Sequence, residues 1–356
     1  MKNSLIILFS TILLVSCNSG NSDKKAKNNK SKPVAITAAG ATFPLPFYNL
    51  AIKNYTKNTG ILLTYGGIGS GGGIRSLKDK VVDFGATDAF LSEEKEADMP
   101  AEIVHIPTCI GAVVIAYNLP EVEGLKLSNQ NLEDIFLGNI IKWNDDKLKE
   151  SNPDLMLPDL EITVVHRSDG SGTTYIFSDF MSKISADWES TVGRGKSLKW
   201  PVGIGAKGNP GVAGTIKQTV GAVGYIGSEF AFAQNIAFAR VKNGAGNYIM
   251  PGLESISAAA QGEIPADTKV MLTNSSDPNA YPISGFTWLI LYKEQKYDRR
   301  SKTQAEETHK FLSWIIEKDA QALAQQVNYA PLPEKAVLQA KIILSTVVYD
   351  GESLRK

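Results

Sequence analysis

Three short stretches place glycines and small hydroxyl residues between an extended run and a helical run. They are residues 39–44 (AGATFP), 67–73 (GIGSGGG) and 169–173 (DGSGT). A helix start offers unpaired N–H groups and a partial positive charge, glycine lets a ligand approach the backbone, and hydroxyls add further donors. One such turn alone is typical of an ordinary helix N-cap. Three of them in one chain, at the carboxyl ends of strands, favour a shared site for a tetrahedral oxyanion.

Ser171, in the third turn, is also a candidate nucleophile. A serine nucleophile needs a base beside it, and the histidine close to it in sequence is His166. If residues 161–167 form a strand, His166 and Arg167 point to opposite faces, so both cannot face the turn. The nucleophile-elbow pattern G-x-S-x-G is absent around Ser70 and Ser171. We therefore predict that Ser171 donates a hydrogen bond and that no residue is catalytic. The alternative is a secreted phosphatase or phosphoryl-handling enzyme that uses Ser171.

Other kinds of site have little support in the sequence. Gly67, Gly69 and Gly72 match G-x-G-x-x-G and Asp83 follows them, but the helix between is short and no Walker motif occurs. The three histidines lack the spacing of a metal site. The 37 basic and 37 acidic residues cancel, so a general attraction to nucleic acid is not favoured. We expect no cofactor, no metal and no nucleic-acid partner.

The N-terminal residues predict export and anchoring. Lys2 precedes an apolar run of 11 residues, 5–15 (LIILFSTILLV), which is far shorter than the ~20 residues that span a bilayer. We predict a signal peptide over residues 1–16. The sequence LVSC resembles the bacterial lipobox, in which the chain is cut before a cysteine that is then lipidated, here Cys17. Residues 17–32 would form the lipidated cysteine and a flexible linker, because 18–32 contain no aliphatic side chain larger than alanine. The expected location is the periplasm or cell envelope, with contact to the membrane through the anchor alone.

The rest of the chain alternates strand-like and helical runs, which predicts an α/β fold with mostly parallel sheets. The length of 356 residues suits two domains. Several runs are rich in β-branched residues without clean alternation, as in strands covered on both faces. The expected strands include 34–40, 61–65, 103–117, 161–167 and 287–292, and the expected helices include 47–55, 73–80, 176–184, 309–327 and 334–349.

Taken together, the turns and their flanking sequences closely resemble one family, the phosphate-binding proteins of bacterial phosphate ABC transporters. The matching stretches run in family order and cover nearly all of the mature chain. They are AAGATFPLPFY (38–48), YGGIGSGGGI (65–74), VDFGATDAFLS (82–92), LEDIFLGNIIKWND (132–145), HRSDGSGTTYIF (166–177), KWPVGIGAKGNPGV (199–212), GAVGYI (221–226) and YPISGFTWLIL (281–291).

The resemblance implies a role for each residue in these turns. In this family a dehydrated phosphate is held between two lobes by hydrogen bonds. Side-chain or backbone donors would come from Thr42, Phe43, Ser70, Ser171, Gly172 and Thr173. Arg167 would be the one cation that touches the anion, and Asp169 would hold Arg167 in position.

The resemblance also gives Asp88, in GATDAF, a role that charge alone would not suggest. An ionised carboxylate accepts hydrogen bonds and donates none, so Asp88 would take the proton that phosphate carries at neutral pH. Sulfate has no such proton and would be repelled. From the residues alone, Asp88 is equally well explained as a surface cap for a helix that begins near Leu91. A sulfate- or molybdate-binding protein of the same fold remains an alternative.

The sequence departs from the common family pattern at three positions near the site. Gly71 stands where a second serine is frequent, Phe90 replaces a common proline, and His166 replaces a common arginine. The last change leaves Arg167 as the only basic side chain that we place at the site.

The implied architecture is a type II-like periplasmic binding protein with its ligand in the cleft between two lobes. Lobe I would take residues 33–115 plus 285–356, and lobe II residues 116–284. The chain would cross between them within 110–118 and 283–291, and a hinge motion would bury the anion. The implied function is that of a monomeric binding protein, not an enzyme. It would bind inorganic phosphate and deliver it to the permease subunits of an ABC transporter.

Overall fold

One eight-stranded sheet organises the computed structural model, which describes residues 34–298 and 300–354. The predicted signal peptide, Cys17 and linker lie outside the described residues. The strand order is β2-β1-β3-β11-β4-β8-β6-β7. The strands are β1 (Ala35–Gly40), β2 (Leu62–Gly67), β3 (Phe84–Thr87), β4 (Ile103–Tyr117), β6 (Thr163–Arg167), β7 (Ile204–Ala206), β8 (Ala222–Gly227) and β11 (Ser284–Tyr292).

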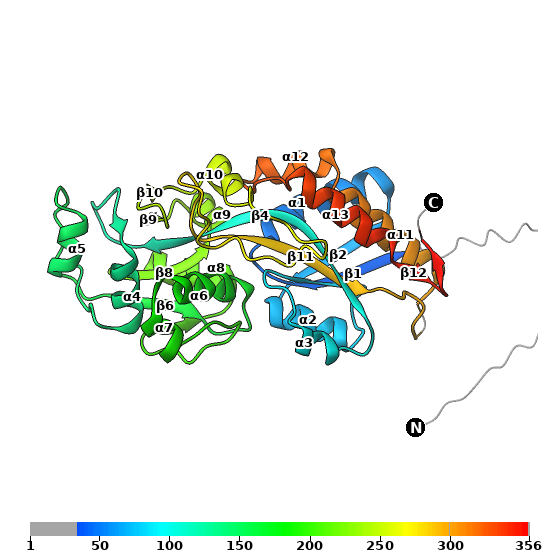
Figure 1. The fold of residues 1–356 in the computed structure, drawn as a ribbon, viewed down its shortest axis with the longest axis horizontal. Helices are drawn as coiled ribbons and strands as arrows, with labels where there is room; N and C mark the ends of the chain where they lie inside the picture. Colours follow the sequence, from blue (N-terminus) through cyan, green and yellow to red (C-terminus); the bar gives the residue numbers. More distant parts are fainter. Residues whose placement is uncertain (1–33, 299, 355–356) are drawn as a thin grey trace, which may run out of the picture. The chain divides into compact units, whose positions relative to one another are not determined.

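Strand β4 joins the two ends of this sheet. Its first part pairs antiparallel with β11, where Ile103 lies opposite Tyr292, and its last part pairs antiparallel with β8, where Val113 lies opposite Gly227. All of β4 and β11 is buried, which agrees with strands covered on both faces. In Figure 1 the cyan β4 and the yellow-orange β11 run side by side. The strands that precede the site turns pair in parallel, β1 with β2 and β3, and β6 with β7 and β8.

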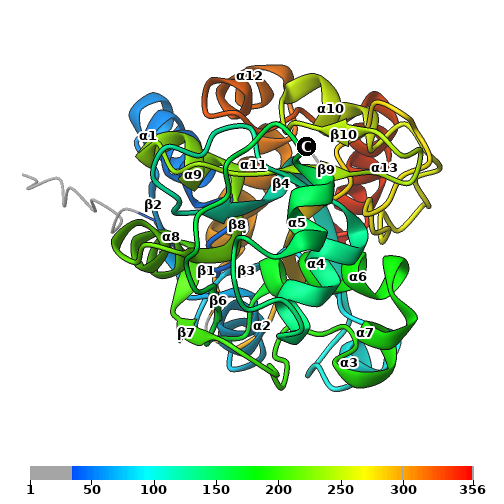
Figure 2. The ribbon, with the colours of Figure 1, turned by 90° about the vertical axis from the view of Figure 1, so that its left-hand side faces the viewer.

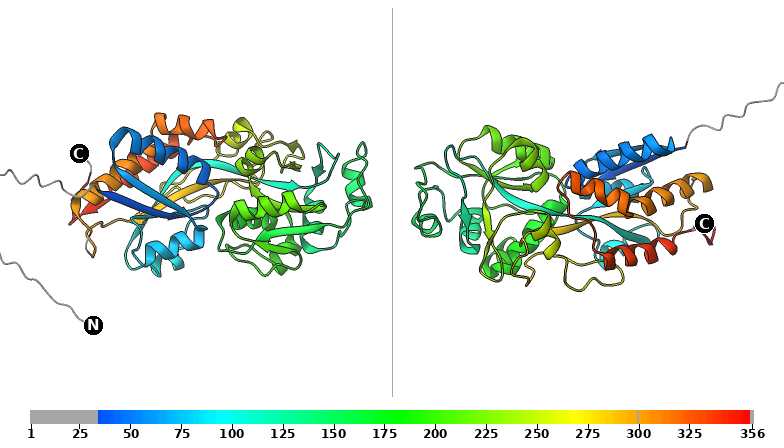
Figure 3. Two further views of the ribbon diagram at one scale, coloured as in Figure 1. Left: turned by 180° about the vertical axis from the view of Figure 1, so that it is seen from behind. Right: turned by 90° about the horizontal axis from the view of Figure 1, so that it is seen from above.

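The helices form two groups, one at each end of β4 (Figure 3). Those of lobe I are α1 (Leu45–Thr59), α2 (Ser70–Lys78), α3 (Glu93–Ala97), α11 (Lys302–Ile315), α12 (Lys318–Gln326) and α13 (Glu334–Ser345). Those of lobe II are α4 (Asn129–Leu137), α5 (Asp146–Ser151), α6 (Gly172–Ile184), α7 (Ala186–Thr191), α8 (Gly208–Gln218), α9 (Ser228–Gln234) and α10 (Leu253–Ala258). In lobe I, α1, α2 and α11 pack with strands among β1, β2, β3 and β11, and in lobe II, α6, α8 and α9 pack with strands among β6, β7 and β8. Figure 2 shows α6 and α8 on either side of β8.

Short strands complete the fold outside the main sheet. In lobe II, β10 (Tyr248–Ile249), β9 (Arg240–Lys242) and β5 (Lys126–Leu127) form a three-stranded sheet, and in lobe I β12 (Val348–Tyr349) pairs with β13 (Glu352–Ser353). The lobe boundaries predicted at 115/116 and 284/285 fall inside β4 and β11 and stay predictions. In the ranges 34–298 and 300–354, no helix combines the length and the apolar content needed to cross a bilayer.

Most predicted elements are confirmed, with two local differences. The helix expected over 309–327 is interrupted, since α11 ends at Ile315 and α12 begins at Lys318. The break lets both helices turn an apolar face to the core, with Leu312 of α11 and Ala324 of α12 completely buried. The helix expected over 334–349 ends at Ser345, because Val348 and Tyr349 form the short strand β12, which pairs with β13.

Asp83 holds together elements of lobe I. It is buried, and its carboxylate forms an ion pair with Arg300 and accepts hydrogen bonds from the Thr37 backbone N–H at 2.7 Å and from Gln304 Nε2 at 2.8 Å. These partners belong to β1, to α11 and to the loop before α11. Asp83 therefore has a structural role, which removes the support for a dinucleotide site.

Replacement of Asp83 by alanine should lower the free energy of unfolding by about 3–5 kcal/mol, because Arg300 would be left buried without its carboxylate. Denaturant unfolding measures this difference. The matched control is Glu102→Ala, which removes the partner of Lys293 in an exposed pair and should cost less than about 1 kcal/mol. Equal losses in the two variants would show that the buried pair contributes little to the fold.

Candidate functional site

The three predicted turns meet at one place between the lobes. Thr42 follows β1, Ser70 begins α2, and residues 171–173 begin α6. The Gly172 N–H of lobe II donates to Ser70 Oγ of lobe I at 3.1 Å, and the Gly71 N–H donates to the Gly170 carbonyl at 2.8 Å. Thr42, Ser70, Ser171 and Thr173 are all buried. The structure therefore brings donors from both lobes into one water-poor site.

Glycine is required where the lobes approach each other. A Cβ on Gly172 would lie 2.5 Å from Ser70 Oγ and 2.6 Å from Asp88 Oδ2, so any side chain at this position would push Ser70 and Asp88 away from their present positions. A Cβ on Gly71 would lie 3.2 Å from Gly170 Cα. The glycine at position 71, where the family often has serine, thus permits a close contact between the turns of the two lobes.

Arg167 ends β6 and is held by Asp169 in a two-point contact. Its Nε donates to Asp169 Oδ1 at 2.7 Å, its Nη2 donates to Oδ2 at 2.6 Å, and its Nη1 donates to Thr173 Oγ1 at 3.2 Å. Burial opposes ionisation of Asp169, but hydrogen bonds and charge from Arg167 outweigh it and lower the pKa of this carboxyl. His166 points elsewhere and stacks on Trp200, with ring centroids 4.7 Å apart.

Asp88 follows β3 and is 1% exposed. Its Oδ1 accepts from Thr287 Oγ1 of β11 at 2.7 Å, and its Oδ2 lies 3.5 Å from Ser70 Oγ. Burial raises the pKa of Asp88 from 3.8 to about 7, against the opposing effects of Thr287, Arg167, Ser70 and Lys196. The interpretation of Asp88 as a surface helix cap is wrong, because Ser92 caps α3 and Asp88 faces the site.

Ser70, Ser171 and Phe43 are placed at helix starts or in a turn. Ser70 Oγ accepts from the backbone N–H groups of Asp88 at 3.2 Å and of Gly172 at 3.1 Å, and its own hydrogen is directed at Asp88 Oδ2, 3.5 Å away. Ser171 caps α6 by accepting from the Thr174 N–H at 3.0 Å, and its hydroxyl hydrogen is not used in that bond. Phe43 is buried, and its carbonyl accepts from the Tyr329 hydroxyl.

A second basic residue, Lys196, lies beside the third turn, with its ammonium over the Tyr175 ring at 5.3 Å from the ring centroid, so the prediction that Arg167 is the only basic side chain at the site stays a prediction. Burial raises the pKa of Asp88, and the charge of Lys196 is one of the lesser effects that oppose this rise; burial also lowers the pKa of Lys196 itself to about 8. Its backbone carbonyl accepts from the Ser171 N–H at 2.8 Å. Lys196 also lines a cavity of about 840 Å³ between the lobes, together with Gly71, Arg75, Lys78 and Lys95.

Two further polar residues of the site were not predicted, Thr287 and Asn209. Both lie in stretches that carry the family resemblance, but neither was given a role. Asn209 begins α8 after β7 in the sequence GAKGNPG, which repeats the pattern of a strand, glycines and a small polar residue at a helix start. That pattern could have identified a fourth turn. Thr287 lies within a buried strand and gives no comparable signal.

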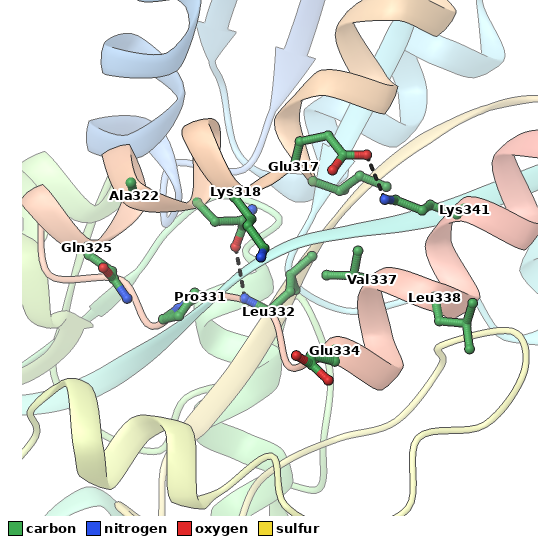
Figure 4. A pocket seen from close by; sticks show the side chains of 12 residues that line it. Glu317, Lys318, Ala322, Gln325, Pro331, Leu332, Glu334, Val337, Leu338 and Lys341 are labelled. Atoms are coloured by element: carbon green, nitrogen blue, oxygen red, sulfur yellow. Dashed lines mark hydrogen bonds and ion pairs between the residues drawn. The ribbon is translucent and has the colours of Figure 1, made fainter.

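Another hollow lies between α12 and α13 (Figure 4). It has a volume of about 450 Å³ and is lined largely by apolar side chains such as Leu332, Val337 and Leu338. Its edge carries an ion pair between Glu317 and Lys341 at 2.7 Å. None of the predicted site residues lines it, so the interlobe site is the better candidate for binding an anion.

The chain is similar to proteins of known function over most of its length. A family model described as a PBP superfamily domain matches residues 26–319. The phosphate-binding protein PstS of Xylella fastidiosa (strain 9a5c) is 38% identical over 325 residues, which cover 90% of this chain and 87% of the relative. PstS of Haemophilus influenzae is 40% identical over 312 residues, covering 86% and 91%. The solved structure of a high-affinity periplasmic phosphate-binding protein, PfluDING, bound with phosphate, shares the fold with a TM-score of 0.70 at 24% identity, covering 87% and 93%.

Replacement of Asp88 by asparagine should stabilise the ligand-free protein at pH 8, by on the order of 1–4 kcal/mol. Since the pKa of Asp88 is raised in the fold, its ionised form is unfavourable there. This cost is present in full above about pH 7 and is lost towards pH 4, where the carboxyl is protonated in the folded and the unfolded state.

Urea unfolding between pH 8 and pH 5 measures this effect, and the advantage of Asp88→Asn should shrink as the pH falls. The matched control is Asp79→Asn, an exposed carboxyl at the end of α2, which should change stability by less than about 0.5 kcal/mol. A variant that is less stable than the parent at pH 8 would contradict the account of Asp88.

Proposed function

Because the chain belongs to the PBP superfamily and, within it, to the family of PstS phosphate-binding proteins, as its motifs predicted, we propose that it binds inorganic phosphate between its lobes and passes it to the permease of an ABC transporter. The observation that carries the proposal is the combination of many hydrogen-bond donors with one buried carboxylate. Sulfate would need donors at every oxygen, whereas a protonated phosphate needs one acceptor as well.

In this proposal each site residue has one role toward the anion. Arg167, fixed by Asp169, supplies a charge-assisted hydrogen bond. The hydroxyls of Thr42, Ser70, Ser171 and Thr173 and the backbone N–H groups of Phe43, Gly172 and Thr173 donate further bonds. Asp88 accepts the phosphate proton. For these bonds to form, the Gly172 N–H must exchange its present partner, Ser70 Oγ, and the Ser70 hydroxyl must turn from Asp88 Oδ2 to the anion.

The same geometry favours binding over catalysis. Within the described ranges, Ser171 Oγ bonds the Thr174 N–H, and His166 stacks on Trp200 instead of approaching Ser171. A serine nucleophile without a base stays protonated and unreactive. We therefore propose a solute-binding role and no enzymatic reaction.

Delivery requires that the lobes open and close. We propose that lobe I (33–115 plus 285–356) and lobe II (116–284) hinge about the crossing strands β4 and β11 and that the permease recognises the closed form. We also propose that the mature chain is anchored through a lipidated Cys17, which would hold a monomeric body beside the membrane, outside the cytoplasm.

Calorimetry on the full-length chain in detergent should show one phosphate bound per chain, competition by arsenate, and no detectable binding of sulfate at pH 8. The same preparation should not hydrolyse a chromogenic phosphomonoester. Phosphomonoester turnover that disappears in Ser171→Ala would overturn the binding-protein proposal in favour of the enzyme alternative, and tight sulfate binding would favour the sulfate-binding alternative.

Replacement of Asp88 by asparagine should reduce the ratio of phosphate to sulfate affinity at pH 8 at least tenfold. The amide cannot accept the phosphate proton as a carboxylate does, and its NH₂ group can donate to sulfate. Competition calorimetry measures the ratio, with Asp187→Asn, an exposed carboxyl on α7, as the control that should leave it unchanged. If the ratio in Asp88→Asn equals that of the parent, the role of Asp88 as proton acceptor is wrong.

A further inference from the structure

Asn209 contacts both lobes through one side chain. It is completely buried at the start of α8 in lobe II. Its backbone N–H and its Nδ2 donate to Thr42 Oγ1 of lobe I at 3.1 and 3.0 Å, and Nδ2 also donates to Thr173 Oγ1 of lobe II at 3.1 Å. These two hydroxyls are the threonine donors of the proposed phosphate site.

The orientation of the Asn209 amide is fixed by its oxygen. Asn209 Oδ1 accepts from the Gly227 N–H at 3.0 Å. A backbone N–H can donate and cannot accept, so the oxygen must face Gly227 and the NH₂ group must face the threonines. The assignment of donor and acceptor in this network therefore follows from chemistry.

The donors to each threonine occupy the acceptor positions of its hydroxyl. A hydroxyl oxygen has two lone pairs and one hydrogen. Thr42 Oγ1 receives two hydrogen bonds, both from Asn209. Thr173 Oγ1 also receives two, one from Asn209 Nδ2 and one from Arg167 Nη1. With both lone pairs engaged, each hydroxyl hydrogen must point away from these donors.

We propose that Asn209 is the positioning residue of the phosphate site, because it turns the hydroxyl hydrogens of Thr42 and Thr173 toward the anion and forms its contact with Thr42 when the lobes are closed. The inference rests on the proposed function. Asn209 itself acts through the two threonines and need not touch the ligand. Two donors oriented in advance cost no reorganisation when the anion arrives, which increases affinity.

A role as an ordinary helix cap does not account for these contacts. The N-cap residue of α8 is Lys207, and no side-chain hydrogen bond caps that helix. The Asn209 side chain is engaged with Thr42, Thr173 and Gly227 instead. The side chain of Asn209 therefore contacts the site residues and the other lobe, and it does not cap the helix.

The sharpest test compares Asn209→Ala with Asn209→Asp by phosphate calorimetry on the full-length chain. Loss of the donors in Asn209→Ala should weaken phosphate binding about 10- to 100-fold. Asn209→Asp is nearly the same shape, but its carboxylate accepts the hydroxyl hydrogens that phosphate needs and adds a negative charge. It should therefore weaken binding more than Asn209→Ala does, and phosphate should dissociate faster in stopped-flow measurements.

A double-mutant cycle separates positioning from general support of the fold. In a Thr42→Val/Thr173→Val background the hydroxyls are gone, so Asn209→Ala should then change affinity less than threefold. The matched control is Asn118→Ala, which removes side-chain bonds to the carbonyls of Ile216 and Lys217 at the other end of α8. It should leave phosphate affinity within twofold of the parent.

Thermal unfolding without ligand shows whether each variant is folded, and Asn209→Ser is made beside Asn209→Ala in case the alanine variant does not fold. The inference is overturned if the folded Asn209 variants bind phosphate within twofold of the parent, or if the loss is the same with and without the threonine hydroxyls. A parent chain that fails to bind phosphate would instead overturn the proposed function, and the inference with it.

Discussion

A carboxyl group with almost no access to water governs the arrangement of the site. Asp88 is 1% exposed, and burial raises its pKa to about 7. An isolated carboxylate in such a place would be strongly unfavourable. The fold surrounds it with groups from distant parts of the chain, namely Thr287 of the crossing strand β11, Ser70 of α2, and the cations Arg167 and Lys196. These groups oppose the rise that burial causes in the pKa of Asp88, and among the described residues Arg167 forms its ion pair with Asp169 and not with Asp88.

The same requirement is consistent with the proposed ligand site between the lobes. A site that must exclude water and still admit an anion needs walls that can separate. The turns that follow parallel strands lie at the same edge of the sheet. Lobe I supplies Thr42, Ser70 and Asp88, and lobe II supplies Arg167 and the start of α6. Asn209 then connects the two sets through Thr42 and Thr173.

Sequence reasoning predicted the parts of this site that are encoded locally. Glycine and hydroxyl residues at helix starts identify the turns around Thr42, Ser70 and Ser171 because backbone geometry requires those residue types there. The resemblance added Asp88 and Arg167. Thr287 and Asn209 were missed since their importance depends on tertiary contacts, with Thr287 hidden in an apolar strand and Asn209 joined to Thr42 of the other lobe.

The differences between the predicted and the observed fold also arise from tertiary contacts that the local sequence does not encode. The break between α11 and α12 leaves no clear trace in the helical pattern, because both helices have apolar faces and good helix formers. The end of α13 at Ser345 depends on the pairing of Val348 and Tyr349 with β13, which lies further along the chain. The strands and the α/β class could be predicted from the sequence pattern. The continuity of one sheet through β4 could not, because it depends on strand pairings that the sequence does not display.

The central claim is that Asp88 accepts a proton from bound phosphate while the surrounding hydroxyls donate to it. Neutron diffraction from deuterated crystals of the phosphate complex grown at pH 8 tests this directly, because it locates hydrogen isotopes. The account predicts one deuterium between Asp88 and a phosphate oxygen, with the deuterons of Thr42 and Thr173 aimed at the ligand. A phosphate oxygen that faces Asp88 with no deuterium between them, or threonine deuterons directed away from the anion, would contradict it.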